Sequence, residues 1–505
     1  MSRPSPTRKL LGVFAISAWA SFSLAHADPT GSGGRRAERI HRVESELLPI
    51  TALPSQLGRY ANLRDRMRAY GVPGISVAVI QNGRIDWAKG YGWANIAART
   101  PVTADTLFQA ASISKPVAAL GALLLVEQGE LGLDTDIDHD LRRWKVPGNQ
   151  LTEVHPVTLR TLLDHSAGLT DVAFPDYRAG AETPTLLQTL ETSSPAIRVE
   201  TVPGRQYRYG ATAFAVLQVL MEDASKMPFQ AYMQSQVLRP LQMTHSTFEE
   251  PLPIRLTKSA ALGYYAGGAP VAGGYRYGPE LAVAGLWTTP SDLARFIVEL
   301  QRDYAGKHPG LIDAALTRQM LSTQIAYRGL GVVISGKGDD SRFGHDGFNY
   351  GFESAMLGYV HRGQGAVVMA NSGFAYMLIR EIMGSIARVY GWPHFDWTNQ
   401  WPPATPLRQQ QVTAIPVNVL ASATGRYAFG KDSFIDIYAD GRRLFLHFPG
   451  NGNAEVFRTS DGQFFCPQLT FSDFGDPRLR FERADNGKVD KIIASYGHLV
   501  LTRTN

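Results

Sequence analysis

The sequence predicts an α+β protein, in which a large mixed domain is followed by a small all-β domain. Near the start, residues 75–80 form a β-branched, apolar run, Asn82-Gly83 is a strong turn signal, and residues 84–91 provide a returning strand. Helical patterns fill the middle of the chain and strands return near the end of this part. After residue 425, short alternating runs separated by turn signals favour a second unit made of strands.

The first residues have the features of a secretory signal. Three basic residues precede the apolar stretch Leu10–Leu24, and residues 25–27 read Ala-His-Ala, the small-x-small form of a signal-peptidase site. This stretch of about fifteen residues is shorter than the roughly twenty that a membrane-spanning helix needs. We therefore predict that residues 1–27 are removed, that the mature chain keeps no stable membrane span, and that it is periplasmic or secreted. An uncleaved membrane anchor is the alternative.

Charge and cysteine content bear on nucleic-acid binding and on disulfide bonds. Removal of residues 1–27 takes away three positive charges and no negative ones, so the net charge falls from +5 to about +2. The basic balance therefore gives no reason to expect a nucleic-acid partner. Cys466 is the one cysteine, which excludes an internal disulfide.

The large domain is expected over residues 45–392, after a flexible, glycine-rich leader over residues 28–44. Val117–Gln128 is apolar and helix-favouring, a proline stands before it in what would be the first turn, and a glycine follows its end. This helix should begin near residues 112–115. Further helices are expected at Thr158–Leu163, Thr212–Asp223, Ser291–Gln301 and Ala375–Tyr390, and strands at Tyr327–Ser335 and Ala366–Ala370.

The composition changes between the two domains. Residues 393–416 are rich in proline, tryptophan, threonine and glutamine and lack periodicity, so we expect a linker there. Over residues 417–505, alternating runs such as Phe434–Tyr438 and Leu444–Phe448 are separated by Asp-Gly and Asn-Gly turn signals. This pattern predicts an antiparallel sheet or a small barrel.

Ser112 and Lys115 have the spacing of a nucleophile and its base. Residues three apart on a helix lie on one face, so the lysine amine can reach the serine hydroxyl. A lysine is normally protonated at neutral pH, but the alanines and leucines that follow provide apolar surroundings, which lower the pKa of an amine. The N–H groups at the helix start favour negative charge, which makes the N–H of Ser112 a candidate oxyanion donor.

A Ser-x-x-Lys spacing arises about once by chance in a chain of this length, so the flanking residues decide its meaning. Residues 108–115 read Phe-Gln-Ala-Ala-Ser-Ile-Ser-Lys and resemble the nucleophile motif of the serine β-lactamase and penicillin-binding-protein family, which includes class C β-lactamases, DD-peptidases and family VIII esterases. Segments similar to later motifs of the family follow in its order at residues 162–169, 203–209, 285–293 and 344–347. The resemblance covers roughly residues 55–395 and implies the transpeptidase-like fold, an antiparallel sheet flanked by helices with a helical lobe.

The resemblance also assigns the other residues of the site. It implies that the catalytic residues are Ser112, Lys115 and Tyr209, that the substrate and electrostatic residues are His345 and Gly347, and that the oxyanion donors are the N–H groups of Ser112 and Phe348. A tyrosine beside a cationic lysine or histidine can hold a lowered pKa and relay a proton between the serine and the leaving group. His165 is expected to have a structural role. No cofactor or metal is required.

Two departures from the family pattern bear on the substrate. The family's tyrosine motif usually reads Tyr-Ser-Asn, whereas residues 209–211 read Tyr-Gly-Ala and lack the amide that binds the substrate's acyl-amide side chain. Asp346 occupies the position of a threonine that helps to bind a substrate carboxylate, and a carboxylate there would repel that anion. We therefore expect substrates in the order esters, D-amino-acid peptides, β-lactams.

The expected function is metal-independent hydrolysis through an acyl-enzyme on Ser112. The expected partner is a small-molecule or peptide substrate, with cell-wall peptide as one candidate. A non-catalytic receptor for an acyl ligand or wall peptide on the same fold is the alternative. In a third interpretation, the C-terminal β domain is the ligand or partner module and the large domain is its scaffold.

Overall fold

The computed structural model places the chain in two domains and describes most of its residues. The described residues are 29–49, 51–52, 58–172, 174–265, 268–306, 309–395, 410–428, 434–448, 452–466, 478–494 and 499–504. The predicted signal peptide, residues 1–27, lies outside them. Within these ranges, no helix has both the length and the apolar character that crossing a bilayer requires.

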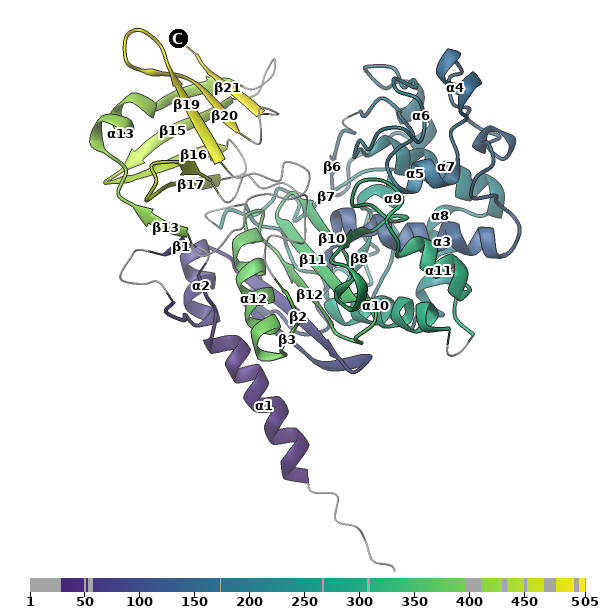
Figure 1. Cartoon of the computed structure of the whole chain (residues 1–505), viewed down its shortest axis with the longest axis horizontal. Coiled ribbons are helices and arrows are strands. Elements are labelled where there is room, and N and C mark those ends of the chain that lie inside the picture. Colours follow the sequence, from purple (N-terminus) through teal and green to yellow (C-terminus); the bar gives the residue numbers. More distant parts are fainter. Residues whose placement is uncertain are drawn as a thin grey trace, which may run out of the picture.

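Seven of the described strands form an antiparallel sheet at the centre of the large domain (Figure 1). They are β2 (Gly74–Gln81), β3 (Arg84–Asn95), β4 (Thr100–Pro101), β9 (Val333–Ser335), β10 (Arg342–Asn349), β11 (Phe352–Tyr359) and β12 (Gly365–Ala370), in the order β4-β3-β2-β12-β11-β10-β9. The predicted hairpin is β2–β3. Its turn residues Asn82 and Gly83 have φ of 55° and 66°, as the favoured two-residue hairpin turn requires.

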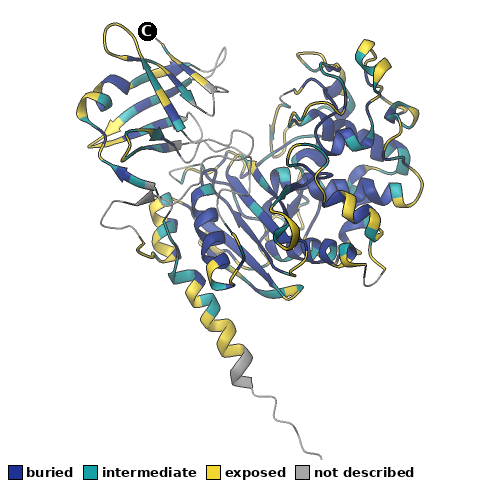
Figure 2. Cartoon of the chain, in the orientation of Figure 1, coloured by how far each residue is buried: buried dark blue, intermediate teal, exposed yellow. Residues whose placement is uncertain are grey.

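Helices cover both faces of this sheet. One face carries α1 (Pro29–Ser45), α2 (Leu63–Tyr70) and α12 (Tyr376–Val389), and the other carries α10 (Pro290–Ala305). Successive side chains of a strand point to opposite faces. Accordingly, Ile75, Val77 and Val79 of β2 pack in the cluster with α12, whereas Ala78 and Ile80 pack in the cluster with α10. Figure 2 shows the sheet buried between these layers.

A helical lobe packs beside the second face and is continuous with its core (Figure 1). Its helices are α3 (Ser114–Glu127), α4 (Gln150–Val154), α5 (Leu159–Leu163), α6 (Leu186–Glu191), α7 (Thr212–Ser225), α8 (Phe229–Met233), α9 (Leu281–Ala284) and α11 (Ala314–Met320). Every residue from Ser114 to Leu125 of α3 is buried. A helix that is apolar on all sides belongs in a core, and α3 therefore holds the residues at its start rigidly.

The C-terminal domain is a closed antiparallel barrel with one short helix, α13 (Val417–Ala423). Its described strands are β14 (Gly425–Ala428), β15 (Phe434–Asp440), β16 (Arg443–Phe448), β17 (Gly452–Thr459), β18 (Phe464–Phe465), β19 (Arg478–Arg483), β20 (Val489–Ala494) and β21 (Leu499–Arg503). Each pairs with the next along the chain, and β21 pairs back with β14. The ring leaves no free edge among these strands. Of the two predicted arrangements, an antiparallel sheet or a small barrel, the structure has the barrel.

The segment predicted as a linker, residues 393–416, contains the strand β13 (Gln410–Thr413). This strand pairs with β17 of the barrel and, in parallel, with β1 (Thr51–Ala52), which precedes the seven-stranded sheet in the chain. The two domains are therefore joined by strand pairing as well as by the covalent chain.

The prediction of an unstructured leader over residues 28–44 is wrong for residues 29–44, which belong to α1. The glycines lie at the beginning of this helix, and its later part is fixed by tertiary contacts. Val43 is buried and its carbonyl accepts a hydrogen bond from Ser385 Oγ at 3.1 Å. Arg39 donates to Asp86 of β3 at 2.8 Å. These contacts override the low helix propensity of the glycines.

The predicted strand Tyr327–Ser335 is also wrong over most of its length, because only Val333–Ser335 is a strand. Gly331 has φ of 78°, a conformation that breaks a regular strand and that glycine adopts readily. The turn brings Arg328 into the interior, where it is 1% exposed.

Glu353 of β11 is buried beneath the start of α12, where the N–H groups of Ala375 and Tyr376 favour its ionised form. Burial outweighs these donors and raises its pKa to about 8, and the nearby Asp346 adds to this effect. In the unfolded chain a glutamate is ionised above about pH 4.5. The folded protein therefore binds the extra proton between about pH 4.5 and 8, and this group lowers stability as the pH rises through that window.

We expect Glu353→Gln to remove this pH dependence, because glutamine is neutral in both states. The variant should match wild type near pH 5 and exceed it in stability near pH 8.5 by roughly 2–5 kcal/mol. Thermal unfolding at several pH values measures the difference. The exposed Glu153→Gln is the control, and parallel curves for Glu353→Gln and wild type would contradict the expectation.

Candidate active site

Ser112, Lys115 and Tyr209 meet at the start of α3. The Nζ of Lys115 lies 3.1 Å from Ser112 Oγ, and the hydroxyl of Tyr209 lies 3.0 Å from the same oxygen. Lys115 is 1% exposed, and its Nζ also donates to the carbonyl of Val283 at 3.0 Å. Ser112 remains partly exposed. Both candidate proton carriers therefore contact the side-chain oxygen of a serine that is not fully buried.

The backbone around Ser112 is shaped for this position. Residues 111–113 form a 3-10 turn that leads into α3, and Ala111 has φ of 48°, which is costly for a residue with a side chain. Strand β10 passes very close to this turn. A Cβ added at Gly347 would lie 2.1 Å from the carbonyl oxygen of Ala110, so only glycine permits the approach. This contact sets β10 against the nucleophile segment.

Tyr209 is held by a stack of rings and by a helix start. The ring of His165 lies 4.4 Å from its ring, and the N–H of Gly210 donates to His165 Nδ1 at 3.4 Å. Asp171 accepts a hydrogen bond from the N–H of Ala211 at 2.7 Å, immediately before α7. His165 is buried, and burial followed by the charges of Arg328 and Lys115 lowers its pKa well below the usual value. It lies against Tyr209 as an uncharged ring.

His345 of β10 is likewise uncharged. Its Nδ1 lies 2.6 Å from the carbonyl of Asp346, and since a carbonyl only accepts, Nδ1 carries the proton. Burial, together with the positive charges of Arg328 and Lys115, lowers its pKa well below the usual value. Its ring centre is 6.2 Å from that of Tyr209. A cationic histidine beside the tyrosine, one of two options in the sequence-based hypothesis, is therefore wrong.

Arg328 supplies a further positive charge beside Tyr209 and is one of the residues that the sequence does not reveal. Its guanidinium lies 5.0 Å from the centre of the Tyr209 ring and 3.4 Å from His345 Nε2. It also donates to the hydroxyl of Tyr207 at 2.8 Å. The only available signal is a charged residue inside an apolar, glycine-rich stretch that the pattern assigns to a strand.

The remaining predicted residues also lie on β10. Phe348 pairs with Glu353 of β11 and is 43% exposed. Because the preceding Gly347 lies against the carbonyl of Ala110, the N–H of Phe348 belongs to a segment that borders the nucleophile turn. Successive side chains of a strand point to opposite faces, so Asp346 points away from the face that carries His345 and Gly347. It shares its face with Glu353 and lies away from the nucleophile turn. Repulsion of a substrate carboxylate by Asp346 is therefore weaker than the sequence suggests.

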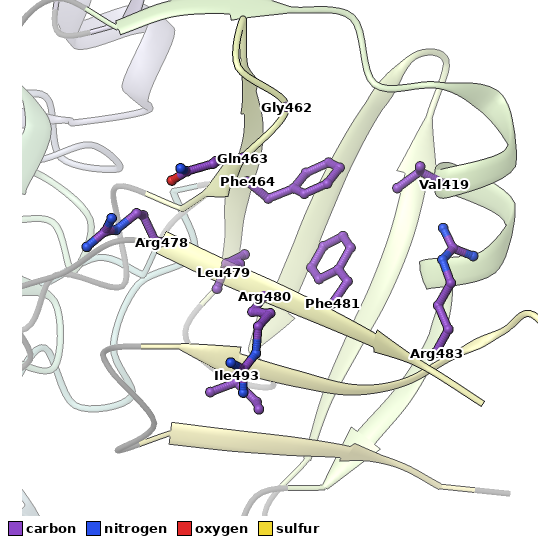
Figure 3. Close-up of a pocket in the computed structure, with 10 residues that line it drawn as sticks. All are labelled: Val419, Gly462, Gln463, Phe464, Arg478, Leu479, Arg480, Phe481, Arg483 and Ile493. Atoms are coloured by element: carbon purple, nitrogen blue, oxygen red, sulfur yellow. The ribbon is translucent and has the colours of Figure 1, made fainter.

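A separate cavity of about 730 Å³ lies in the barrel and takes no part in this site (Figure 3). Phe464 and Phe481 stack there with ring centres 4.6 Å apart. The other lining residues are Val419, Gly462, Gln463, Arg478, Leu479, Arg480, Arg483 and Ile493. All belong to the C-terminal domain, so this cavity has no contact with Ser112.

Two curated proteins are similar in sequence. Protein flp of Staphylococcus aureus (strain N315) is 25% identical over 319 residues, which are 61% of this chain and 61% of that protein. Penicillin-binding protein 4* of Bacillus subtilis (strain 168) is 24% identical over 416 residues, which are 78% of this chain and 88% of that protein. The chain thus spans about 61% of the length of the first of these relatives.

Two solved structures share the fold. SurE with D-Leu has a TM-score of 0.56 and 20% identity, over 94% of this chain and 100% of that chain. The D-amino acid amidase from Ochrobactrum anthropi SV3, complexed with L-phenylalanine amide, has a TM-score of 0.54 and 21% identity. The match covers 65% of this chain and 96% of that chain. The family described as Beta-lactamase matches residues 61–378, more than half of the chain. With the fold and this match together, the chain belongs to the Beta-lactamase family.

Proposed function

We propose that this protein is a serine hydrolase that acts through an acyl-enzyme on Ser112. The observation that carries the proposal is the position of Ser112 Oγ, within hydrogen-bond distance of both Lys115 Nζ and the Tyr209 hydroxyl. A serine is activated when a base lies within hydrogen-bond distance of its hydroxyl and further groups orient that base. The family match supports the assignment.

The proposed reaction has two halves. In the first, Lys115 acts in its neutral form: Ser112 Oγ attacks the substrate carbonyl and its proton passes to the Lys115 amine. Tyr209 gives its proton to the leaving alcohol or amine and recovers one from Lys115, so both groups return to their starting state. Burial of Lys115 supports this role because it penalises the charged form of an amine. In the second half, water attacks the acyl-enzyme, and its proton replaces the one on Ser112 as the acid leaves.

We propose esters and small amides, including D-amino-acid derivatives, as substrates ahead of β-lactams. Residues 209–211 read Tyr-Gly-Ala, so Ala211 stands where the family pattern has an amide side chain, and its N–H is bound by Asp171 at 2.7 Å. The neighbour solved with D-Leu and the amidase solved with an amino-acid amide support amino-acid derivatives as the class to test. Cell-wall peptide remains a candidate within that class.

The test is the intact mass of the mature protein after incubation with an aryl ester and, separately, with a penicillin. We expect an acyl adduct from the ester that forms and then decays, because acylation and hydrolysis proceed in sequence. The same incubation with Ser112→Ala should give no adduct. If penicillin forms an adduct about as fast as the ester does, whether that adduct lasts or is rapidly cleared, the proposed substrate order is contradicted. Absence of any adduct would favour a non-catalytic receptor.

A further inference from the structure

A small cavity of about 50 Å³ lies beside the catalytic lysine. It is bordered by Ala284 and Gly285, which follow the carbonyl of Val283 that Lys115 contacts. Gln109, three residues before Ser112, and Asn349, next to Phe348, also line it. The segments that position the nucleophile, its base and β10 therefore enclose this cavity together.

The wall of this cavity carries an excess of carboxylates. Its described lining contains Asp176, Glu250 and Glu280 but one cation, Arg276. Asp176 and Arg276 face each other at 3.7 Å, which leaves the two glutamates in excess. The side-chain amides are already engaged: Gln109 donates to the carbonyl of Arg276 at 2.6 Å and accepts from Asn349 at 3.0 Å.

Both glutamates present an oxygen without a hydrogen bond. Glu250 Oε1 accepts from Trp287 Nε1 at 2.7 Å, and the Gln109 side chain and the N–H of Leu252 also stabilise this carboxylate. Its Oε2 is buried from solvent and makes no hydrogen bond of normal length with the described residues. Glu280 Oε2 is in the same condition. A buried polar atom without a partner costs free energy, and a ligand, an ion or a water can supply that partner. Two such acceptors on one cavity call for a donor with several hydrogens.

The environment of the glutamates fits a cationic donor. Burial raises the pKa of Glu250 to about 8 and that of Glu280 to about 7, while the charge of Lys115 lowers the latter in part. A bound cation would relieve this cost for both groups. An ammonium group is compact and carries three donors, so it can serve two carboxylates on one small cavity.

We propose that this cavity binds the protonated amine of the substrate's acyl part, so that Ser112 is acylated preferentially by aminoacyl esters and amides. The inference rests on the proposed hydrolase function and names its substrate class. Glu280 and Glu250 are the specificity-determining residues. Gly278 makes room for Glu280, since a Cβ there would lie 2.3 Å from Glu280 Oε1.

The test compares D-alanine methyl ester with methyl propionate, which lacks the amine but is otherwise alike. We measure kcat/KM for both at pH 7 with wild type, Glu280→Gln and Glu250→Gln. The ratio of the two values should fall at least about tenfold in each variant, because a hydrogen bond to a charged group is lost. Using the ratio within each variant removes the intrinsic reactivity of the amino ester. The exposed Glu191→Gln is the control and should keep the wild-type ratio.

Two further results keep the inference separate from the hydrolase function. Gly278→Ala should lower the ratio as well, because it displaces the Glu280 carboxylate without removing it. Binding to Ser112→Ala, which needs no turnover, should favour D-alaninamide over propionamide, and adding Glu280→Gln should abolish the preference. An unchanged ratio in all three variants, or equal binding of the two amides, would overturn the inference and leave a cavity that holds water only.

Discussion

Lys115→Met should lower the rate of Ser112 acylation by roughly 10³–10⁵-fold, the largest loss that we expect from a residue other than the nucleophile. Methionine matches the length of the buried stem but cannot accept the proton of Ser112. It also loses the contact with the carbonyl of Val283, which helps to hold the amine beside the serine. The folded state should persist because methionine suits an apolar core.

The measurement is the single-turnover rate of acyl-enzyme formation from an aryl ester, with the melting temperature as a check of folding. The exposed Lys145→Met is the matched control and should behave as wild type. If Lys115→Met acylates within tenfold of wild type, another group is the base, and the direct contact between Lys115 and Ser112 has only a structural role.

Tyr209→Phe should lower kcat/KM by roughly 10²–10⁴-fold, the usual range for loss of a positioned acid or base. The substitution removes only the hydroxyl that lies 3.0 Å from Ser112 Oγ and keeps the ring that packs against His165. The loss should be larger for a substrate with a poor leaving group, such as an alkyl ester, than for an aryl ester, because a poor leaving group needs the returned proton more.

Tyr207→Phe is the matched control. It removes a hydroxyl two residues away that contacts Arg328 instead of Ser112, so its effect should be at least tenfold smaller. Equal losses in the two variants would indicate that the whole tyrosine segment acts by position, and that the Tyr209 hydroxyl does not carry a proton.

The parts of the fold that the sequence predicts depend on local signals. Asn82-Gly83 requires positive φ at both positions, and it forms the turn between β2 and β3. The apolar run after Ser112 forms α3 because its residues are buried on every side. Strands β10 and β11 are different: their glycines and charged residues lower strand propensity. They become strands by pairing with each other, with β9 on one side and with β12 on the other.

The parts of the site that the sequence misses depend on contacts between distant segments. Arg328 reaches Tyr207 and His345 because the turn at Gly331 folds it inward, and no local pattern encodes that meeting. Glu250 and Glu280 face one cavity although thirty positions separate them in the sequence. No local pattern shows that they meet. Burial converts these otherwise ordinary surface-type residues into groups with perturbed chemistry.

The pairing of β1 with β13 changes how the two domains can move. A domain joined by a single covalent linker swivels about one point. Here the segment before the central sheet and the segment after it run in parallel and are hydrogen-bonded to each other and to the barrel wall. The barrel is therefore attached to the large domain through both ends of that domain, and we expect it to rotate less freely than a domain held by one covalent connection.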